Sequence, residues 1–111
     1  MPQVATLRHL EVLIARENDI VDLTPLKNLK KLRTLVLRHN MVEDLAPLKN
    51  LTELEVLDFF DCLIKDIKPL LNLKKLAYVD LSHNELNSIS RLEYIPVLKD
   101  KNPNVEILWD E

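Results

Sequence analysis

The sequence predicts an α/β solenoid, with a curved parallel sheet of about five strands on its concave face and short helical turns on its convex side. The first observation is a strict repeat of apolar residues, which recur every 22 residues at Leu7, Leu29, Leu51 and Leu73. The second is an alternating apolar segment in each unit, which is typical of a short strand with one buried face. Because such a period indicates stacked units around a continuous core, it favours surface binding over catalysis in a central pocket.

One domain is expected over residues 1–111, built of four repeats and a cap. The repeats cover residues 7–28, 29–50, 51–72 and 73–94, and the C-terminal cap covers 95–111. Further apolar columns are expected to fill the core. In the first repeat these columns begin at Leu10, Leu13, Ala15, Ile20, Leu23 and Leu26.

A strand is expected in each unit where apolar residues alternate with other residues. The five predicted strands are residues 12–16, 34–38, 56–60, 78–82 and 105–109. One strand per repeat gives a parallel sheet whose neighbouring strands lie about 4.8 Å apart. The side chains between the leucines then line the concave face.

A polar column follows the strands, at Asn18, Asn40, Cys62 and Asn84. An asparagine side chain both donates and accepts hydrogen bonds, so it can bond the backbone of successive turns where the chain leaves the strand. A thiol is a weaker donor that fits the same space, so Cys62 is expected to be buried and inert rather than a nucleophile. The column therefore predicts a structural role.

The returning segments predict short helical turns, because Thr24-Pro25 is typical of an N-cap followed by a first-turn proline. The fourth unit has Arg91 where the other units have proline. A longer helix is therefore predicted over Ser90–Lys99. The side chains expected to be buried in it are Leu92, Ile95 and Leu98.

Both ends need caps, because a terminal repeat leaves one apolar face open. Residues 103–110 predict a last strand with Val105, Ile107 and Trp109 on one face, and Trp109 is expected to cover the last turn. Met1–Thr6 is short for a cap, so three alternatives stay open: these residues fold over the first turn, another molecule stacks there, or the sequence was trimmed. A monomer, or a weak edge-to-edge dimer through this end, is expected.

The repeat, written LxxLxxLxLxxNxIxxLxPLxx over residues 29–50, resembles the leucine-rich repeat of the short 22-residue subclass. That subclass occurs in bacterial internalins and in a nuclear regulatory subunit of protein phosphatase 1. The tail resembles the C-terminal cap of intracellular leucine-rich-repeat proteins. Its matching residues are Arg91, Tyr94, Pro103, Val105, Leu108 and Asp110, and Trp109 departs from the pattern. The resemblance implies a non-catalytic protein–protein interaction module and leaves the partner open.

Composition narrows the classes of function. The chain contains no glycine, which excludes the glycine-rich loops that cradle phosphates. A net charge of −3 does not favour nucleic-acid binding, and no apolar run is long enough to cross a membrane. A single cysteine forms no internal disulfide and no secretory signal opens the chain, so a cytoplasmic or nuclear location is expected. No cofactor and no small-molecule substrate is expected.

The concave face is the predicted binding site for another protein. It is basic in its first two repeats and acidic and aromatic in the next two. The predicted contact residues are Arg16, Arg38, Asp58, Phe60, Asp61, Tyr78, Asp80 and His83. Exposed aromatic side chains beside charges are the usual anchors of a protein interface. The aromatic patch and its aspartates are expected to favour a basic segment with an apolar tip.

Other interpretations of these residues are weaker. His39, Asp61 and His83 share one column, but the histidines would lie about 10 Å apart, too far for one Zn²⁺ with bonds of roughly 2 Å. Asp58 and Asp80 are neighbours that could share a proton, but catalysis is not expected without a cleft that excludes water. The lysines of the returning segments are interpreted as a solubilising edge. The alternative function is a structural or self-associating module, natural or engineered, with no specific ligand.

Overall fold

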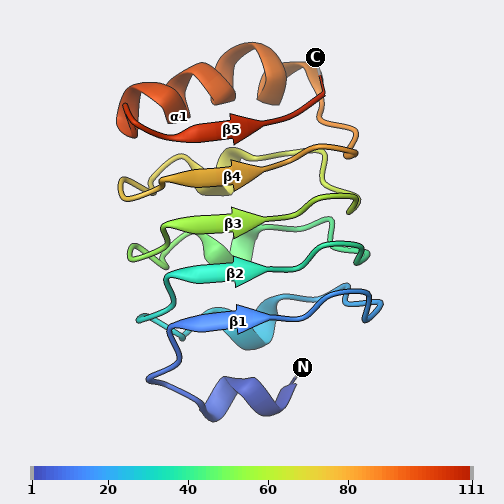
Figure 1. Ribbon diagram of the computed structural model, residues 1–111, viewed down its shortest axis with the longest axis vertical. Coiled ribbons are helices and arrows are strands. Elements are labelled where there is room, and N and C mark those ends of the chain that lie inside the picture. Colours follow the sequence, from blue (N-terminus) through green and yellow to red (C-terminus); the bar gives the residue numbers. More distant parts are fainter. Residues whose placement is uncertain (1, 111) are drawn as a thin grey trace.

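The structure is a computed structural model that describes residues 2–110. Its sheet contains five parallel strands in sequence order (Figure 1). The strands are β1 (Val12–Ile14), β2 (Thr34–Val36), β3 (Val56–Asp58), β4 (Tyr78–Asp80) and β5 (Glu106–Leu108). The register places Leu13 beside Leu35 and Val79 beside Ile107. The predicted fold is confirmed. The strands are shorter than predicted, although backbone hydrogen bonds between the repeats continue beyond them, as from Ala15 N–H to Val36 O.

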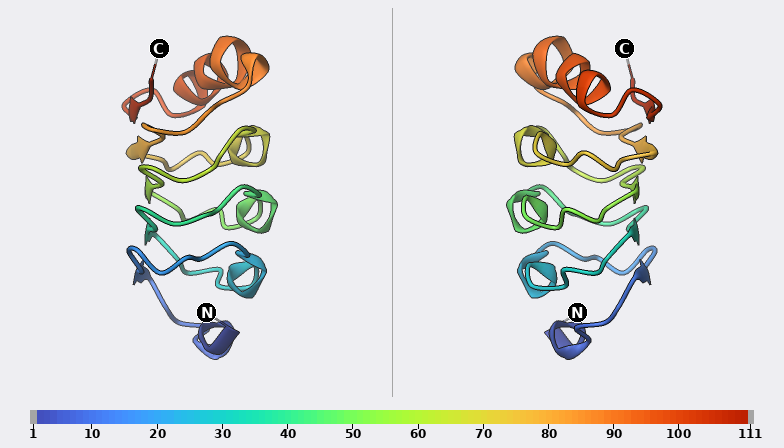
Figure 2. Two further views of the ribbon diagram at one scale, coloured as in Figure 1. Left: turned by 90° about the vertical axis from the view of Figure 1, so that its right-hand side faces the viewer. Right: turned by 90° about the vertical axis from the view of Figure 1, so that its left-hand side faces the viewer.

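Three 3₁₀ helices form the convex side, opposite the sheet (Figure 2). They are η2 (Thr24–Leu26), η3 (Ala46–Leu48) and η4 (Lys68–Leu70). Proline is their second residue, where its missing N–H is not needed. The predicted N-cap at Thr24 was wrong, because Leu23 is the N-cap and Thr24 is the first residue of η2. Asp22 Oδ1 accepts the Thr24 N–H at 2.8 Å. Asp44 and Asp66 repeat this bond two residues before their own turns.

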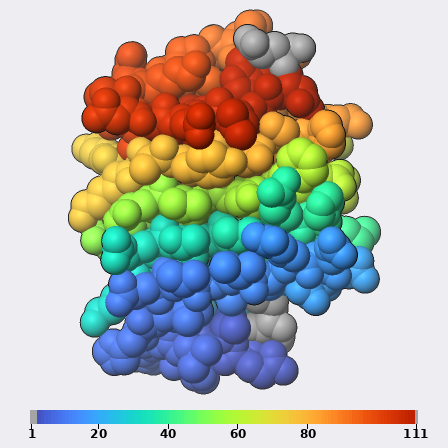
Figure 3. All heavy atoms as spheres, in the orientation of Figure 1, coloured from blue at the N-terminus to red at the C-terminus, as the bar shows by residue number. Residues whose placement is uncertain are grey.

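The leucine columns fill the space between the sheet and the convex turns. Leu29, Leu35 and Leu48 are fully buried, and Phe59 is the largest of the fully buried side chains. Each repeat adds one layer of this kind, and the space-filling view shows the layers as stacked bands (Figure 3). Burying one such side chain stabilises the fold by about 1.5–3 kcal/mol, so the repeated columns are the main source of stability.

A helix closes the C-terminal end of the solenoid, as predicted. It consists of a π-helical turn, η5 (Ser90–Tyr94), followed by α1 (Ile95–Lys101) (Figure 1). Ile95 and Leu98 are buried against the last repeat. Trp109 is half-buried and packs on the same core from the tail.

The first turn of this helix differs from the prediction. Leu92 is 72% exposed, so its predicted burial was wrong. Ser90 lies in the core instead, where its Oγ accepts the Ile67 N–H at 3.0 Å. A π turn is wider than an α turn, so it shifts which side chains face inward.

At the N-terminal end, a 3₁₀ helix, η1 (Pro2–Thr6), packs beside η2 (Figures 1 and 2). Val4 of this helix packs against the core. The described residues of the N-terminal segment therefore fold over the convex half of the first repeat. Among residues 2–110, no helix has the length and apolar character needed to span a membrane.

Candidate functional site

The residue that follows each of β1 to β4 by three positions turns in the left-handed region of backbone space. Glu17, His39, Asp61 and His83 have φ values of 55°, 59°, 56° and 58°. A non-glycine residue is disfavoured in this region by roughly 1–2 kcal/mol. The chain contains no glycine, so other residues adopt this conformation. The turn is held by the asparagine column, since Asn40 Nδ2 donates to Leu37 O at 3.0 Å and also to Arg38 O at 3.2 Å. The repeat thus fixes the two histidines at one rim of the concave face.

Phe60 is the centre of this rim. Its ring is half-buried and meets the His39 ring edge-on, with centroids 5.4 Å apart and planes at 84°. The His83 ring also contacts Phe60, with ring centroids 4.7 Å apart. The Arg38 guanidinium carbon sits 4.4 Å from the Phe60 ring centroid, within the range of a cation–π contact. We call Arg38, His39, Phe60 and His83 the Phe60 cluster.

Two exposed carboxylates orient the imidazoles of the Phe60 cluster. Asp61 Oδ2 lies 2.9 Å from His39 Nδ1. Asp110 Oδ2 accepts the His83 N–H at 2.7 Å and lies 3.6 Å from His83 Nδ1. The C-terminal tail therefore takes part in the site, which the sequence alone did not indicate.

Asp58 and Asp80 lie on the concave face but offer little surface to a partner. They are only 8% and 4% exposed. Asp58 Oδ1 accepts the Phe60 N–H at 3.1 Å, and Asp80 Oδ1 accepts the Ser82 N–H at 2.9 Å. The expectation that they stand out into solvent was wrong, because a short carboxylate folds back onto the N–H two residues on. Asp58 also positions the cluster, since its Oδ2 lies 3.6 Å from Arg38 Nη1.

The remaining predicted residues lie beside the cluster or apart from it. Tyr78 is half-buried, and its hydroxyl lies 3.5 Å from Asp80 Oδ2. Burial, and then the charge of Asp80, raise the pKa of the Tyr78 phenol. Arg16 is exposed in the first repeat, one repeat before Arg38. His39 was not among the predicted contact residues. Its position in the same column as Asp61 and His83 could have indicated that it belongs to this site.

Nothing in the described chain is arranged for metal binding, because residues 2–110 contain no group of three or more His, Cys, Asp or Glu side chains that could hold an ion. Cys62 is buried, as predicted, and its Sγ lies 3.2 Å from Leu37 O. Burial raises the pKa of this thiol, which disfavours the thiolate.

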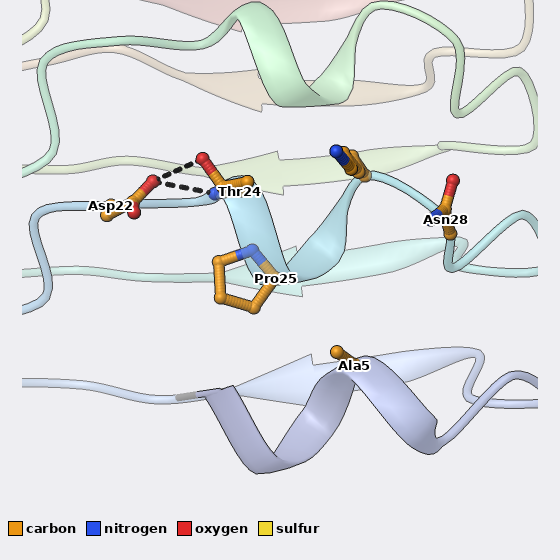
Figure 4. A pocket seen from close by; sticks show the side chains of 6 residues that line it. Ala5, Asp22, Thr24, Pro25 and Asn28 are labelled. Atoms are coloured by element: carbon orange, nitrogen blue, oxygen red, sulfur yellow. Dashed lines mark hydrogen bonds between the residues drawn. The ribbon is translucent and has the colours of Figure 1, made fainter.

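A cavity of about 340 Å³ lies on the convex side, between η1 and η2 (Figure 4). Its wall includes Ala5, Pro25 and Asn28. The Asp22 carboxylate, also in the wall, accepts hydrogen bonds from the N–H and the hydroxyl of Thr24. Those hydrogen bonds lower the pKa of Asp22.

Comparison with known proteins gives a consistent result. The family model described as leucine-rich repeats matches residues 8–50 and 52–94. Internalin C2 from Listeria monocytogenes has a similar structure, with a TM-score of 0.86 and 33% identity, over 99% of this chain and 46% of that chain. An internalin F structure from the same organism gives a TM-score of 0.86 and 30% identity, over 100% of this chain and 33% of that chain. No curated protein sequence matches.

A more distant structural relative is a leucine-rich-repeat protein from Leptospira interrogans, with a TM-score of 0.80 and 25% identity. The match covers 96% of this chain and 27% of that one. The chain thus spans less than half the length of each of these three structures. Both the family model and the internalin structures cover its repeats, and the chain belongs to the leucine-rich repeat family.

Proposed function

We propose that this chain is a non-catalytic module that binds another protein on its concave face, with Phe60 as the anchor. The observation that carries the proposal is the Phe60 cluster, in which one partly exposed aromatic ring is held by two imidazoles and a guanidinium. Leucine-rich-repeat proteins are commonly interaction modules, which supports the class of function.

A ring held in this way suits an interface anchor. Interface hot spots are enriched in aromatic and arginine side chains that sit near the centre of the contact. Ordering a mobile side chain on binding costs about 0.5–1.5 kcal/mol, so a ring already fixed by its neighbours avoids part of that cost. The cluster also lies beside the middle strands of the sheet, so a partner centred on it can contact the concave face of the repeats before and after it.

The structure changes the chemistry expected of the partner. Asp58 and Asp80 are buried, so the exposed acids near Phe60 are Asp61 and Asp110, each beside an imidazole. We therefore infer that an apolar side chain of the partner packs on Phe60, while charged groups around it set the orientation and the association rate. The basic segment with an apolar tip that is expected from the sequence remains one kind of partner that fits this description.

Replacing Phe60 with alanine is expected to weaken partner binding by about 1–3 kcal/mol, which is the range of an interface anchor. The partner is first captured with the wild-type chain, and its affinity for each variant is then measured by titration calorimetry. Lys30→Ala and Lys74→Ala on the convex edge are the matched controls, and they should leave the affinity unchanged. The proposal fails if Phe60→Ala binds like the wild type while a lysine variant does not.

We also propose a cytoplasmic or nuclear location for this chain. The support is chemical: Cys62 is a free thiol in the asparagine column, and a reducing compartment keeps such a thiol reduced. Fluorescence microscopy of the full-length protein in its own cells tests this, and an extracellular signal would overturn it.

A further inference from the structure

The outer edge of β1 is an open strand edge. Among residues 2–110, β1 is the first strand of the sheet and β2 is its one strand partner. The Ala15 N–H donates to Val36 O at 2.9 Å, and Glu11 O accepts the Thr34 N–H at 3.0 Å. In a parallel strand, the backbone N–H and C=O of successive residues point to the two neighbouring strands in turn. The odd-numbered residues in and around β1 therefore bond the second repeat. The backbone N–H and C=O of Val12 and Ile14 therefore face away from β2, into the open side of the sheet.

The side chains of the first repeat also lack a neighbour. Ile14 is 56% exposed, whereas Val36, its register partner in β2, is 8% exposed. Leu7 is 50% exposed, whereas Leu29 in the same column is fully buried. The edge thus combines unpaired backbone groups with an apolar strip, which is the combination that accepts an added strand.

Only the strand half of this edge is open. η1 occupies the convex half (Figure 2). Val4 of η1 stands 22 residues before Leu26 and packs on the core. A second copy could pair its own β1 with this β1 across a twofold axis. The η2 of that copy would then lie at the level of η1 of this chain, and these two turns would overlap. A single extended segment has no convex turn, so it fits beside β1 without that overlap.

Charged columns across the strands indicate what such a segment carries. Arg33 lies between Glu11, at 3.2 Å, and Glu55, at 3.0 Å. In another column Lys75 pairs with Glu53 at 3.0 Å. These two columns place opposite charges on successive repeats, and opposite charges on neighbouring strands stabilise a sheet.

Two acidic side chains of the first repeat lie at the open edge. Glu11 pairs with Arg33, which directly precedes β2, and Glu17 heads the column that continues with His39 and Asp61. The open edge is thus acidic at Glu11 and Glu17.

We propose that the edge of β1 is a docking site for an extended segment of a partner protein, which adds to the sheet as a parallel strand. The segment carries basic residues opposite Glu11 and Glu17. Apolar residues lie opposite Val12 and Ile14. This surface is separate from the Phe60 cluster, so the two proposals stand or fall independently.

A synthetic peptide with this order of basic and apolar residues tests the proposal against a second peptide in which each basic residue is replaced by an acidic one. Each peptide is titrated into the ¹⁵N-labelled chain and followed by NMR. The matched peptide should shift the amide signals of Val12 and Ile14 and bind about tenfold more tightly than the reversed one, since two cross-strand charge pairs change sign. Glu17→Lys should reverse the preference at the last position, whereas Lys74→Ala should change nothing.

Three results would overturn the proposal. The first is equal affinity for the two peptides, and the second is peptide-induced shifts that avoid β1. The third is self-association of the chain without peptide, measured by sedimentation and lost in Val12→Asp, because the occupant of the edge would then be a second copy.

Discussion

Deletion of residues 103–111 is expected to abolish cooperative folding of this chain. The deletion removes β5 and with it Val105, Ile107 and Trp109, which pack on the core. It also removes Leu108 O, the acceptor of the Leu81 N–H. Three partly buried side chains contribute about 3–6 kcal/mol, which approaches the whole stability of a typical domain of roughly 5–15 kcal/mol. The shortened chain should aggregate and should lose its cooperative denaturant transition, measured by circular dichroism.

From the sequence, this deletion is expected to open an apolar edge formed by Leu81, Ile89 and Leu98. Ile89 is already exposed in the intact chain, whereas Leu81 and Leu98 are buried, as is Val79 of β4. Glu106→Gln, an exposed change on β5, is the control and should keep the wild-type midpoint. A deleted chain that stays monomeric with an unchanged midpoint would contradict the role given to the cap.

Replacing Asn40 with alanine is expected to destabilise the fold by about 1–3 kcal/mol, the cost of leaving buried backbone groups without partners. Asn40 Oδ1 accepts the N–H groups of Asn18, at 3.1 Å, and Ile20, at 2.9 Å. Its Nδ2 donates to Ala15 O at 2.8 Å and to Leu37 O at 3.0 Å. Alanine fills none of these roles, so chemical denaturation should show a lower midpoint with an unchanged slope.

The same column supplies a matched control for Asn40. Asn18 is exposed, and its Nδ2 donates to Arg16 O at 2.7 Å. Asn18→Ala should therefore cost much less than Asn40→Ala, because water can replace the lost partner. Equal losses for the two variants would mean that burial of the bonded groups is not the source of the effect.

The repeat made the fold predictable from the sequence. Leucine columns, strand positions and the structural asparagines follow from periodicity, because each unit must bury the same face against the next. Asn102 was not predicted as part of this system, although its Oδ1 accepts the Leu76 N–H at 2.8 Å in the cap. It lies outside the 22-residue register, so the repeat gave no signal for it. The π turn at Ser90 was missed for a similar reason, since periodicity assumes an unbroken helix.

The site was predicted in part. Strand alternation correctly indicated that Phe60 and Tyr78 share one face of the sheet. Alternation ends where the strand ends, however, so it could not show that Asp58 folds back onto the Phe60 N–H. Contact between Phe60 and the two histidines depends on side-chain rotamers and on the left-handed turns, which residue spacing does not specify.

The most direct test of the account is a hydrogen-exchange footprint of the chain bound to its partner. The account predicts slowed exchange at residues 36–39, 58–61 and 78–83, which hold the Phe60 cluster and its neighbours, with little change in the convex turns η2, η3 and η4. Protection confined to those turns, with unchanged exchange around Phe60, would contradict binding on the concave face.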